Sequence, residues 1–208
     1  GVGKSTLLRL ILGLETPERR DDGGETVMCS DGSPLSGRAA FMAQTDLLLP
    51  WLTALDNVDL GRRLRGAKDE GNGDARVLLD RVGLAANADD RPATLSGGMR
   101  QRVALARTLM EDRPVVLMDE PFSALDAITR IKLQNLAAEL LRDRTVLLVT
   151  HDPLEALRLG HRIHVMAGRP ARLDEALEPA GMPPRNVDDR KLLEMQGDLL
   201  RRLAEASS

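Results

Sequence analysis

Aromatic residues and cysteines are both scarce in this sequence. Its 208 residues include two phenylalanines, one tryptophan and no tyrosine, so few side chains could stack on the ring of a ligand. The single cysteine, Cys29, cannot form a disulfide within the chain, which is typical of a protein from a reducing compartment. We assign Cys29 no function.

Strong charge and long apolar runs are also missing. The formal net charge of −3 provides no general attraction to nucleic acid or anionic lipid. No apolar run approaches the roughly 20 residues that span a bilayer, so a role at a membrane would require a partner. The length suits one domain with a sizeable core.

Glycines and a lysine open the chain in a pattern typical of phosphate binding. The residues Gly1-Val2-Gly3-Lys4-Ser5-Thr6 match the second half of the motif G-x-x-x-x-G-K-[ST], and an apolar helical pattern follows. Such a loop wraps its backbone N–H groups around phosphates, while Lys4 neutralises charge and Ser5 binds Mg²⁺. We expect the first glycine and its strand to lie upstream of residue 1. Taken alone, the segment could also be a Gly-rich turn, although the P-loop is favoured.

Two carboxylates follow a continuous apolar run. The run 114–118 predicts a strand buried on both faces of a parallel sheet, and Asp119 and Glu120 come at its carboxyl end, where α/β folds bind ligands. A second apolar run, 145–150, predicts another buried strand, with His151 at its end. A histidine in that position is more often structural than catalytic.

The stretch Leu95-Ser96-Gly97-Gly98-Met99-Arg100-Gln101-Arg102 precedes an apolar helical pattern. Ser96 is placed to cap a helix whose first N–H groups can bind an anion. By itself, this stretch would be a turn and a cap.

Taken in order, these motifs resemble those of ATP-binding cassette (ABC) ATPases over essentially the whole chain. The resemblance implies an α/β P-loop NTPase fold: a mostly parallel sheet with an all-helical ABC subdomain, and the N-terminal strands missing. It implies a single ABC ATPase domain over 1–208, with a catalytic core in 1–44 and 113–186, a helical subdomain in 45–112 and a C-terminal helix in 187–208. The aromatic residue that stacks on adenine in the family is absent.

The resemblance also assigns roles to single residues. Gly1, Gly3, Lys4, Ser5 and Thr6 would hold ATP. Ser5, Gln44 and Asp119 would act on Mg²⁺, with Asp119 an indirect ligand.

Further residues gain catalytic roles from the same resemblance. Glu120 would polarise the attacking water, while Gln44 and His151 would sense the γ-phosphate. In a homodimer, Ser96, Gly97 and Gly98 would contact the ATP held by the second copy, and Asp126 would cross the interface.

Apolar residues cluster after Gln44, in Leu47-Leu48-Leu49-Pro50-Trp51. We expect them partly to pack within the helical subdomain and partly to form an exposed patch for a transmembrane permease. This stretch of sequence resembles that of ATPase subunits from importers of the nitrate, sulfonate and taurine type. That branch also includes hydroxymethylpyrimidine and thiamine uptake systems. That implies a subunit at the cytoplasmic face of the inner membrane, peripheral through the permease, with an indirect link to a periplasmic or extracellular solute-binding protein. No nucleic-acid partner is expected.

Two other functions remain open from the sequence. One is a non-transport ABC ATPase acting on nucleic acid or ribosomes, although neither a long coiled-coil insert nor a second cassette is visible. The other is a fragment impaired in binding, because residues 1–208 contain only half of the P-loop. We therefore expect weak or absent ATPase activity from the fragment itself.

The remaining segments predict ordinary elements. Helices are expected near residues 4–12, 52–64, 74–82, 127–141, 153–159 and 188–203, with strands at 26–29, 39–43 and 161–167 and a short hairpin within 168–184.

Overall fold

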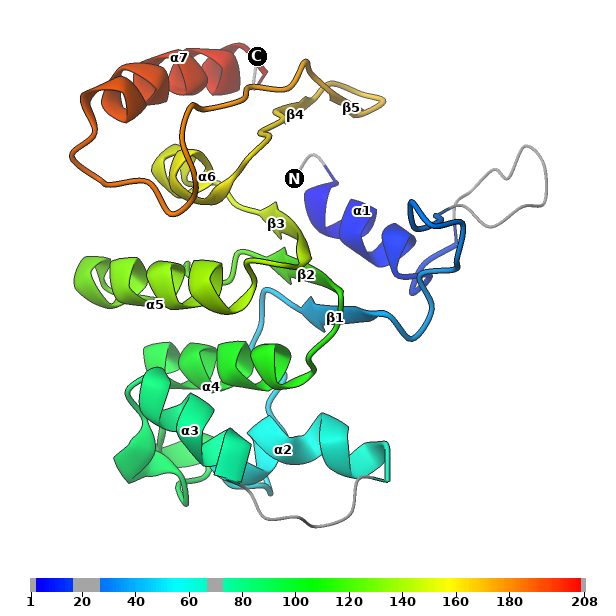
Figure 1. Ribbon diagram of the computed structural model, residues 1–208, viewed down its shortest axis with the longest axis vertical. Coiled ribbons are helices and arrows are strands. Elements are labelled where there is room, and N and C mark those ends of the chain that lie inside the picture. Colours follow the sequence, from blue (N-terminus) through cyan, green and yellow to red (C-terminus); the bar gives the residue numbers. More distant parts are fainter. Residues whose placement is uncertain (1–2, 17–26, 67–72, 207–208) are drawn as a thin grey trace. The chain divides into compact units, whose positions relative to one another are not determined.

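A computed structural model describes residues 3–16, 27–66 and 73–206 (Figure 1). The chain divides into two compact units. One consists of residues 1–39 and 148–208, and the other of residues 40–147.

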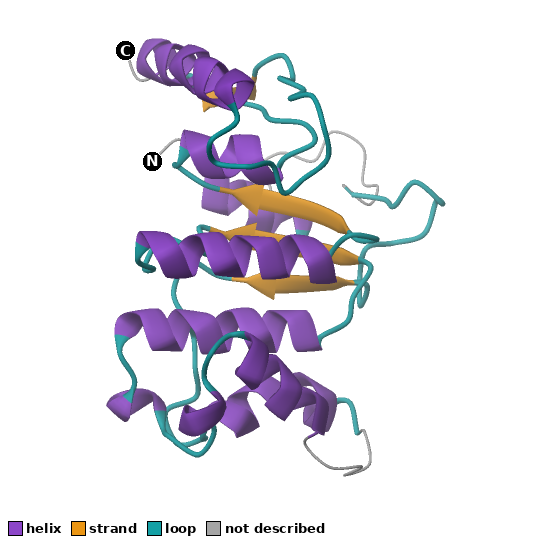
Figure 2. Cartoon of the chain, turned by 60° about the vertical axis from the view of Figure 1, so that its left-hand side comes forward, coloured by secondary structure: helices purple, strands orange, loops and turns teal. Residues whose placement is uncertain are grey.

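The main sheet has three strands, and most of their residues belong to the unit of residues 40–147: β1 (Ala39–Met42), β2 (Val115–Asp119) and β3 (Thr145–Val149). Their order is β1-β2-β3, and Figure 2 shows the arrows of this sheet pointing the same way. The central strand β2 is buried from Val116 to Asp119, as its apolar run predicts.

The expectation that the run 145–150 is a buried strand is only partly correct. Val149 is buried, but Val146 and Leu147 are each 38% exposed. One reason is that β3 is an outer strand of this sheet, with a neighbouring strand on one side only in the part of the chain that the structure describes.

Helices make up most of the rest of this unit. They are α2 (Ala54–Leu64), α3 (Gly73–Arg81), α4 (Gly97–Met110) and α5 (Ala127–Leu140), with 3₁₀ turns η1 (Ala85–Asn87) and η2 (Pro92–Thr94). Helices α2 and α3 both pack on α4. Side-chain caps explain where α2, α4 and α5 begin, because Thr53, Ser96 and Asp126 each accept a bond from the amide three residues on.

The other unit contains α1 (Lys4–Ile11), α6 (Pro153–Leu159), α7 (Arg190–Ala206) and a hairpin of β4 (Met166–Ala167) and β5 (Arg172–Leu173). Leu192 and Leu199 of α7 pack with Leu157 of α6 and with Val165 in one buried cluster. The apolar face predicted for the final helix is therefore docked within its own unit.

Two expected strands are much shorter in the structure. Of the segment 26–29, Thr26 lies outside the described residues, and Met28 forms only an isolated bridge with Pro34. The expected strand 161–167 is reduced to Met166–Ala167. The Val165 amide donates to the Asp174 carboxylate at 2.6 Å, so a side chain replaces the carbonyl that a regular ladder would supply.

Among the described residues, no helix is both long enough and apolar enough to cross a bilayer.

Candidate functional site

Gln44 and Glu120 come together although 76 residues separate them. The Gln44 Nε2 atom donates to the Glu120 Oε2 atom at 3.3 Å. Gln44 follows β1, and Glu120 follows Asp119, the buried last residue of the neighbouring strand β2. The predicted catalytic and Mg²⁺-binding residues of this unit therefore gather at the carboxyl edge of the sheet.

Glu120 has an unusual backbone conformation. Its φ is +50°, in the left-handed region that non-glycine residues rarely adopt. The Glu120 carbonyl accepts a bond from the Ser123 hydroxyl at 3.0 Å. Gln101 of α4 donates to the same carbonyl at 3.4 Å and to the Pro121 carbonyl at 2.9 Å. A turn held in this way directs the Glu120 side chain.

The loop after Gln44 is attached to α4 by two arginines. Arg100 forms an ion pair with Asp46, with 3.0 Å between Nε and Oδ2. Arg107 donates to the carbonyls of Asp46 and Leu47 at 2.7 and 2.8 Å. Burial lowers the pKa of the Arg107 guanidinium, an effect that Asp46 and Glu111 oppose. Arginine stays protonated under such a shift, so the loop is held by a permanent cation.

The apolar residues of this loop divide between core and surface. Leu48 is 8% exposed, whereas Leu47 and Trp51 are 62% and 66% exposed. The buried Asn57 holds the backbone on both sides of Trp51 by accepting from the Leu49 amide and donating to the carbonyls of Leu49, Leu52 and Thr53. The mixture of packing and exposure expected from the sequence is confirmed.

The phosphate-binding candidates lie in the other unit. Gly3 precedes α1 with φ +91°, a conformation that glycine adopts without strain. The Lys4 Nζ atom donates to the Thr150 carbonyl at 3.2 Å, next to His151 in the chain. Ser5 is half-buried and Thr6 is exposed. Gly1 lies outside the described residues.

Ser96, Gly97 and Gly98 form the beginning of α4, as predicted. The Ser96 hydroxyl accepts from the Met99 amide at 3.2 Å, and Ser96 and Gly97 are exposed. A Cβ atom at Gly98 would lie 3.3 Å from the Ala124 carbonyl oxygen, so this helix approaches the turn after Glu120 closely.

Asp126 caps α5 at the far end of that turn. Its carboxylate accepts from the Thr129 amide at 3.0 Å, and this bond lowers the pKa of Asp126.

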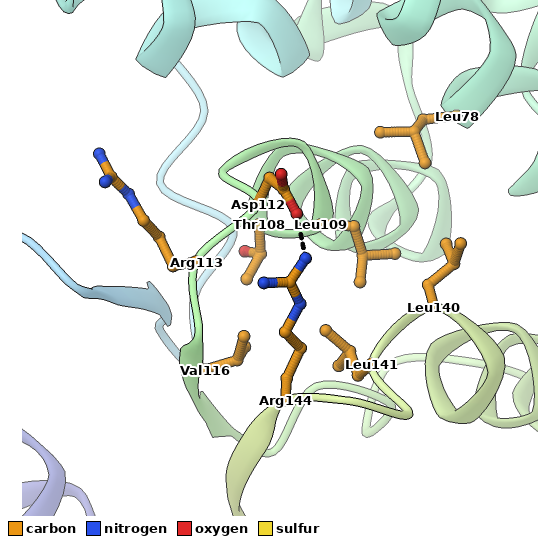
Figure 3. A pocket seen from close by; sticks show the side chains of 9 residues that line it. All are labelled: Leu78, Thr108, Leu109, Asp112, Arg113, Val116, Leu140, Leu141 and Arg144. Atoms are coloured by element: carbon orange, nitrogen blue, oxygen red, sulfur yellow. Dashed lines mark hydrogen bonds and ion pairs between the residues drawn. The ribbon is translucent and has the colours of Figure 1, made fainter. Parts of the chain in front are cut away.

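The structure also has a pocket of about 120 Å³ (Figure 3). It is lined by Leu78, Thr108, Leu109, Asp112, Arg113, Val116, Leu140, Leu141 and Arg144. Asp112 and Arg144 form an ion pair there. Arg113 precedes β2 and Val116 is its second residue, so this pocket lies near the start of the strand, away from Asp119 and Glu120 at its end.

Comparison with known proteins agrees with these motifs. The sequence profile described as ABC transporter matches residues 1–123. The chain belongs to the ABC transporter ATP-binding family. An uncharacterised ABC transporter ATP-binding protein of Haemophilus influenzae is 46% identical over 207 residues, which cover 98% of this chain and 83% of that protein.

Other relatives of this ABC chain carry more specific names. An aliphatic sulfonates import ATP-binding protein of Burkholderia cenocepacia is 43% identical over 96% of this chain and 73% of its own length. One from Rhodococcus jostii is 44% identical, covering all of this chain and 80% of that protein. The predicted resemblance to the sulfonate branch is confirmed at the level of these relatives.

A solved structure supports the ABC fold. It is a dimer of an ATP-binding cassette in a post-hydrolysis state, bound to ADP and Pi. The TM-score is 0.68 with 31% sequence identity, over 87% of this chain and 82% of that one. The P-loop NTPase fold, ATP binding and ATP hydrolysis predicted from the sequence are thereby confirmed.

Sequence reasoning missed three residues that connect parts of the candidate site: Arg100, Gln101 and Arg107. One signal was available. With 3.6 residues per turn, Gln101 falls on the same helical face as the buried Leu105 and Thr108, so a glutamine stands among apolar and small residues. A polar side chain on a buried face requires a partner, and here the partners are two carbonyls.

Proposed function

We propose that this ABC ATPase is the energy-supplying subunit of an importer and that it drives uptake of aliphatic sulfonates through a separate permease. The importer names of the relatives support this proposal. The sulfonate is favoured over nitrate, taurine, hydroxymethylpyrimidine or thiamine because it is the solute that those names give.

The observation that carries the catalytic part is the contact between Gln44 and Glu120. Glu120 polarises the water that attacks the γ-phosphate. Gln44 donates its amide N–H to that carboxylate, which leaves the Gln44 carbonyl oxygen for a cation or the water. His151 senses the γ-phosphate from its place beside Thr150, the residue whose carbonyl accepts from Lys4.

Mg²⁺ and the phosphates are held by chemically suitable groups. Ser5 and Gln44 offer hydroxyl and amide oxygens, the hard ligands that Mg²⁺ prefers, and the Asp119 carboxylate acts on the ion indirectly. Bound Mg²⁺ would neutralise charge on the phosphates. Gly3, Lys4, Ser5 and Thr6 hold the phosphates with backbone N–H groups and an ammonium group, as does Gly1 upstream.

The complete site requires a second copy. The exposed start of α4, with Ser96, Gly97 and Gly98, suits binding of the γ-phosphate of a nucleotide held by the other copy. Asp126 reaches across the same interface. That the structural neighbour is a dimer supports this arrangement.

The permease contacts the exposed side chains of Leu47 and Trp51. The loop that carries them is attached to α4 and begins at Gln44, so movement of the permease reaches both Gln44 and the start of α4. The chain thus acts peripherally at the cytoplasmic face of the membrane, with the solute-binding protein linked only through the permease.

The test of the catalytic proposal is Glu120→Gln in the protein with its complete P-loop. ATP binding should remain, while steady-state hydrolysis should fall roughly 10²- to 10⁴-fold, the range expected on loss of a general base. Thr108→Val, which removes a buried hydroxyl from the distal part of α4, serves as the control. Retained hydrolysis in Glu120→Gln would refute the role of Glu120.

The test of the solute is uptake of a labelled alkanesulfonate by cells lacking the gene. The parent gene should restore uptake, and Glu120→Gln should not. Restored uptake of hydroxymethylpyrimidine or nitrate instead, with no effect on alkanesulfonate, would contradict the solute assignment and leave the ATPase assignment intact.

A further inference from the structure

A buried glutamine connects α4 to the backbone of Glu120. Gln101, in the second turn of α4, is 5% exposed. Its Nε2 atom donates to the Pro121 carbonyl at 2.9 Å and to the Glu120 carbonyl at 3.4 Å. Because a side-chain amide has two N–H donors, one atom serves both carbonyls.

The backbone that Gln101 holds is the strained one. Glu120 has φ +50°, a conformation that persists only where surrounding contacts impose it. Ser123 supplies a second contact from within the turn, through its hydroxyl at 3.0 Å from the Glu120 carbonyl. Gln101 supplies a contact from another element, and it is the buried one.

Two neighbouring positions show that this face of α4 is fitted to the turn. Gly98 lies one helical turn before Gln101, and a Cβ atom there would lie 3.3 Å from the Ala124 carbonyl. From the other direction, Arg130 of α5 donates to the carbonyls of Phe122 and Leu125 at 3.3 and 3.0 Å. The turn 120–125 is therefore held by side chains from α4 and α5. Of the two, Gln101 is the one that donates to the backbone carbonyl of Glu120 itself.

We propose that Gln101 is a positioning residue for ATP hydrolysis: it fixes the Glu120–Pro121 backbone so that the Glu120 carboxylate stays directed toward Gln44 and the attacking water. This inference rests on the proposed role of Glu120. Gln101 itself contacts neither nucleotide nor water. Its effect is on turnover rather than on ATP affinity, because the backbone it holds carries the Glu120 carboxylate.

The first experiment replaces the amide by an apolar group of similar size, Gln101→Met, in the protein with its complete P-loop. We expect kcat to fall roughly 10- to 100-fold, as for a misplaced catalytic group, and the Kd for ATP to stay within about twofold. The matched control is Thr108→Val, which also removes a buried hydrogen bond from α4. The Thr108 hydroxyl donates to the Ala104 carbonyl within the same helix, so its loss does not affect the turn after Glu120. An unchanged kcat in Gln101→Met, or an equal loss in Thr108→Val, would overturn the proposal.

A second variant gives a readout that a merely structural role would not change. In Gln101→Glu, an ionised carboxylate would face two carbonyl oxygens and could not donate, whereas the protonated acid could donate to one. The kcat of this variant relative to the parent should therefore rise as the pH falls from about 8 to about 6, because burial raises the pKa of such a group. This profile decides the matter within one folded protein even if Gln101→Met is too unstable to assay. A flat ratio would count against the proposal.

A double variant separates this inference from the proposed function. If Gln101 acts through Glu120, then Gln101→Met should cause little further loss of kcat in a Glu120→Gln background. A full additional loss there would show that Gln101 acts by another route. If Glu120→Gln alone keeps normal turnover, the proposed role of Glu120 fails first, and the inference fails with it.

Discussion

Several buried side chains in this structure each donate hydrogen bonds to more than one backbone carbonyl, and so hold separate segments together. Arg185 is the most extensive case. It is 6% exposed, and its five N–H donors bond to the carbonyls of Leu157, Gly160, Pro179, Ala180 and Gly181 at 2.7–2.9 Å. Burial lowers the pKa of Arg185 and Asp189 opposes this, but arginine remains charged. One guanidinium thus joins the end of α6 to the segment that leads to α7.

Replacing Arg185 should destabilise that unit strongly. Arg185→Met leaves five carbonyls without their donor, and we expect a loss of about 2–4 kcal/mol in the free energy of unfolding. Arg185→Lys should lose nearly as much, because an ammonium group has three donors and no fork geometry. Urea denaturation measures both.

The control for Arg185 is Arg201→Met on α7. The Arg201 side chain is 74% exposed and pairs only with Asp198, so its loss should change stability by less than about 0.5 kcal/mol. Equal effects at the two positions would contradict the account of Arg185.

The sequence predicted the structural position of single residues well where the pattern is local, and poorly where a side chain bonds to distant backbone. Ser96 as a cap and Asp119 at a strand end follow from local pattern. Arg185 and Gln101 do not, because their carbonyl partners are recognisable only once the chain has folded.

At the scale of elements, α5 combines a structural and a proposed functional role in one residue. Asp126 caps the helix and is also the residue expected to cross the dimer interface. The bond from the Thr129 amide lowers the pKa of Asp126 in the folded protein. A carboxyl group with a depressed folded-state pKa stabilises the fold above its unfolded pKa, and this contribution is lost as the pH falls through the folded pKa.

Two substitutions separate these roles. Asp126→Ala removes the cap, so its melting temperature should lie below that of the parent at neutral pH, and the difference should shrink below about pH 4. Asp126→Asn keeps an equivalent cap and should melt close to the parent, while ATP hydrolysis falls if the charge acts across the interface. Thermal unfolding against pH and steady-state ATPase measure the two effects. A melting difference for Asp126→Ala that grows toward acid pH would contradict the pKa argument.

Element positions were predictable because caps and apolar periodicity are local. Helix α5 was expected over 127–141 and spans Ala127–Leu140. The shortening of the strand expected over 161–167 could not be predicted in this way, because the bond from the Val165 amide goes to the side chain of Asp174, nine residues away. Exposure of Val146 and Leu147 likewise depends on which strands are neighbours, and apolar content alone does not reveal it.

At the scale of the whole molecule, the order of the motifs decides the family, whereas the division into 1–44, 45–112, 113–186 and 187–208 stays a prediction. The compact units of the structure, 1–39 with 148–208 and 40–147, follow contacts rather than motifs. Motifs in a sequence indicate where functional residues lie. The division into compact units depends on side-chain packing, which no single motif encodes.

The proposed dimer yields a prediction that a monomeric site cannot meet. With turnover blocked by Glu120→Gln, the protein with its complete P-loop should be a monomer without nucleotide and a dimer with ATP and Mg²⁺, as measured by light scattering after size exclusion. Adding Lys4→Ala, which removes the ammonium group for the phosphates, should abolish the dimer. Adding Ser96→Arg, which places a bulky side chain at the exposed start of α4, should abolish it too.

Mixing these two impaired proteins is the decisive step. One heterodimer pairs an intact P-loop from the Ser96→Arg chain with an intact α4 start from the Lys4→Ala chain, so it holds one complete site. The mixture should therefore form some dimer with ATP, whereas each protein alone forms none. A mixture that stays monomeric while the Glu120→Gln parent dimerises would contradict a site shared between copies, because it would require both groups to act within one chain.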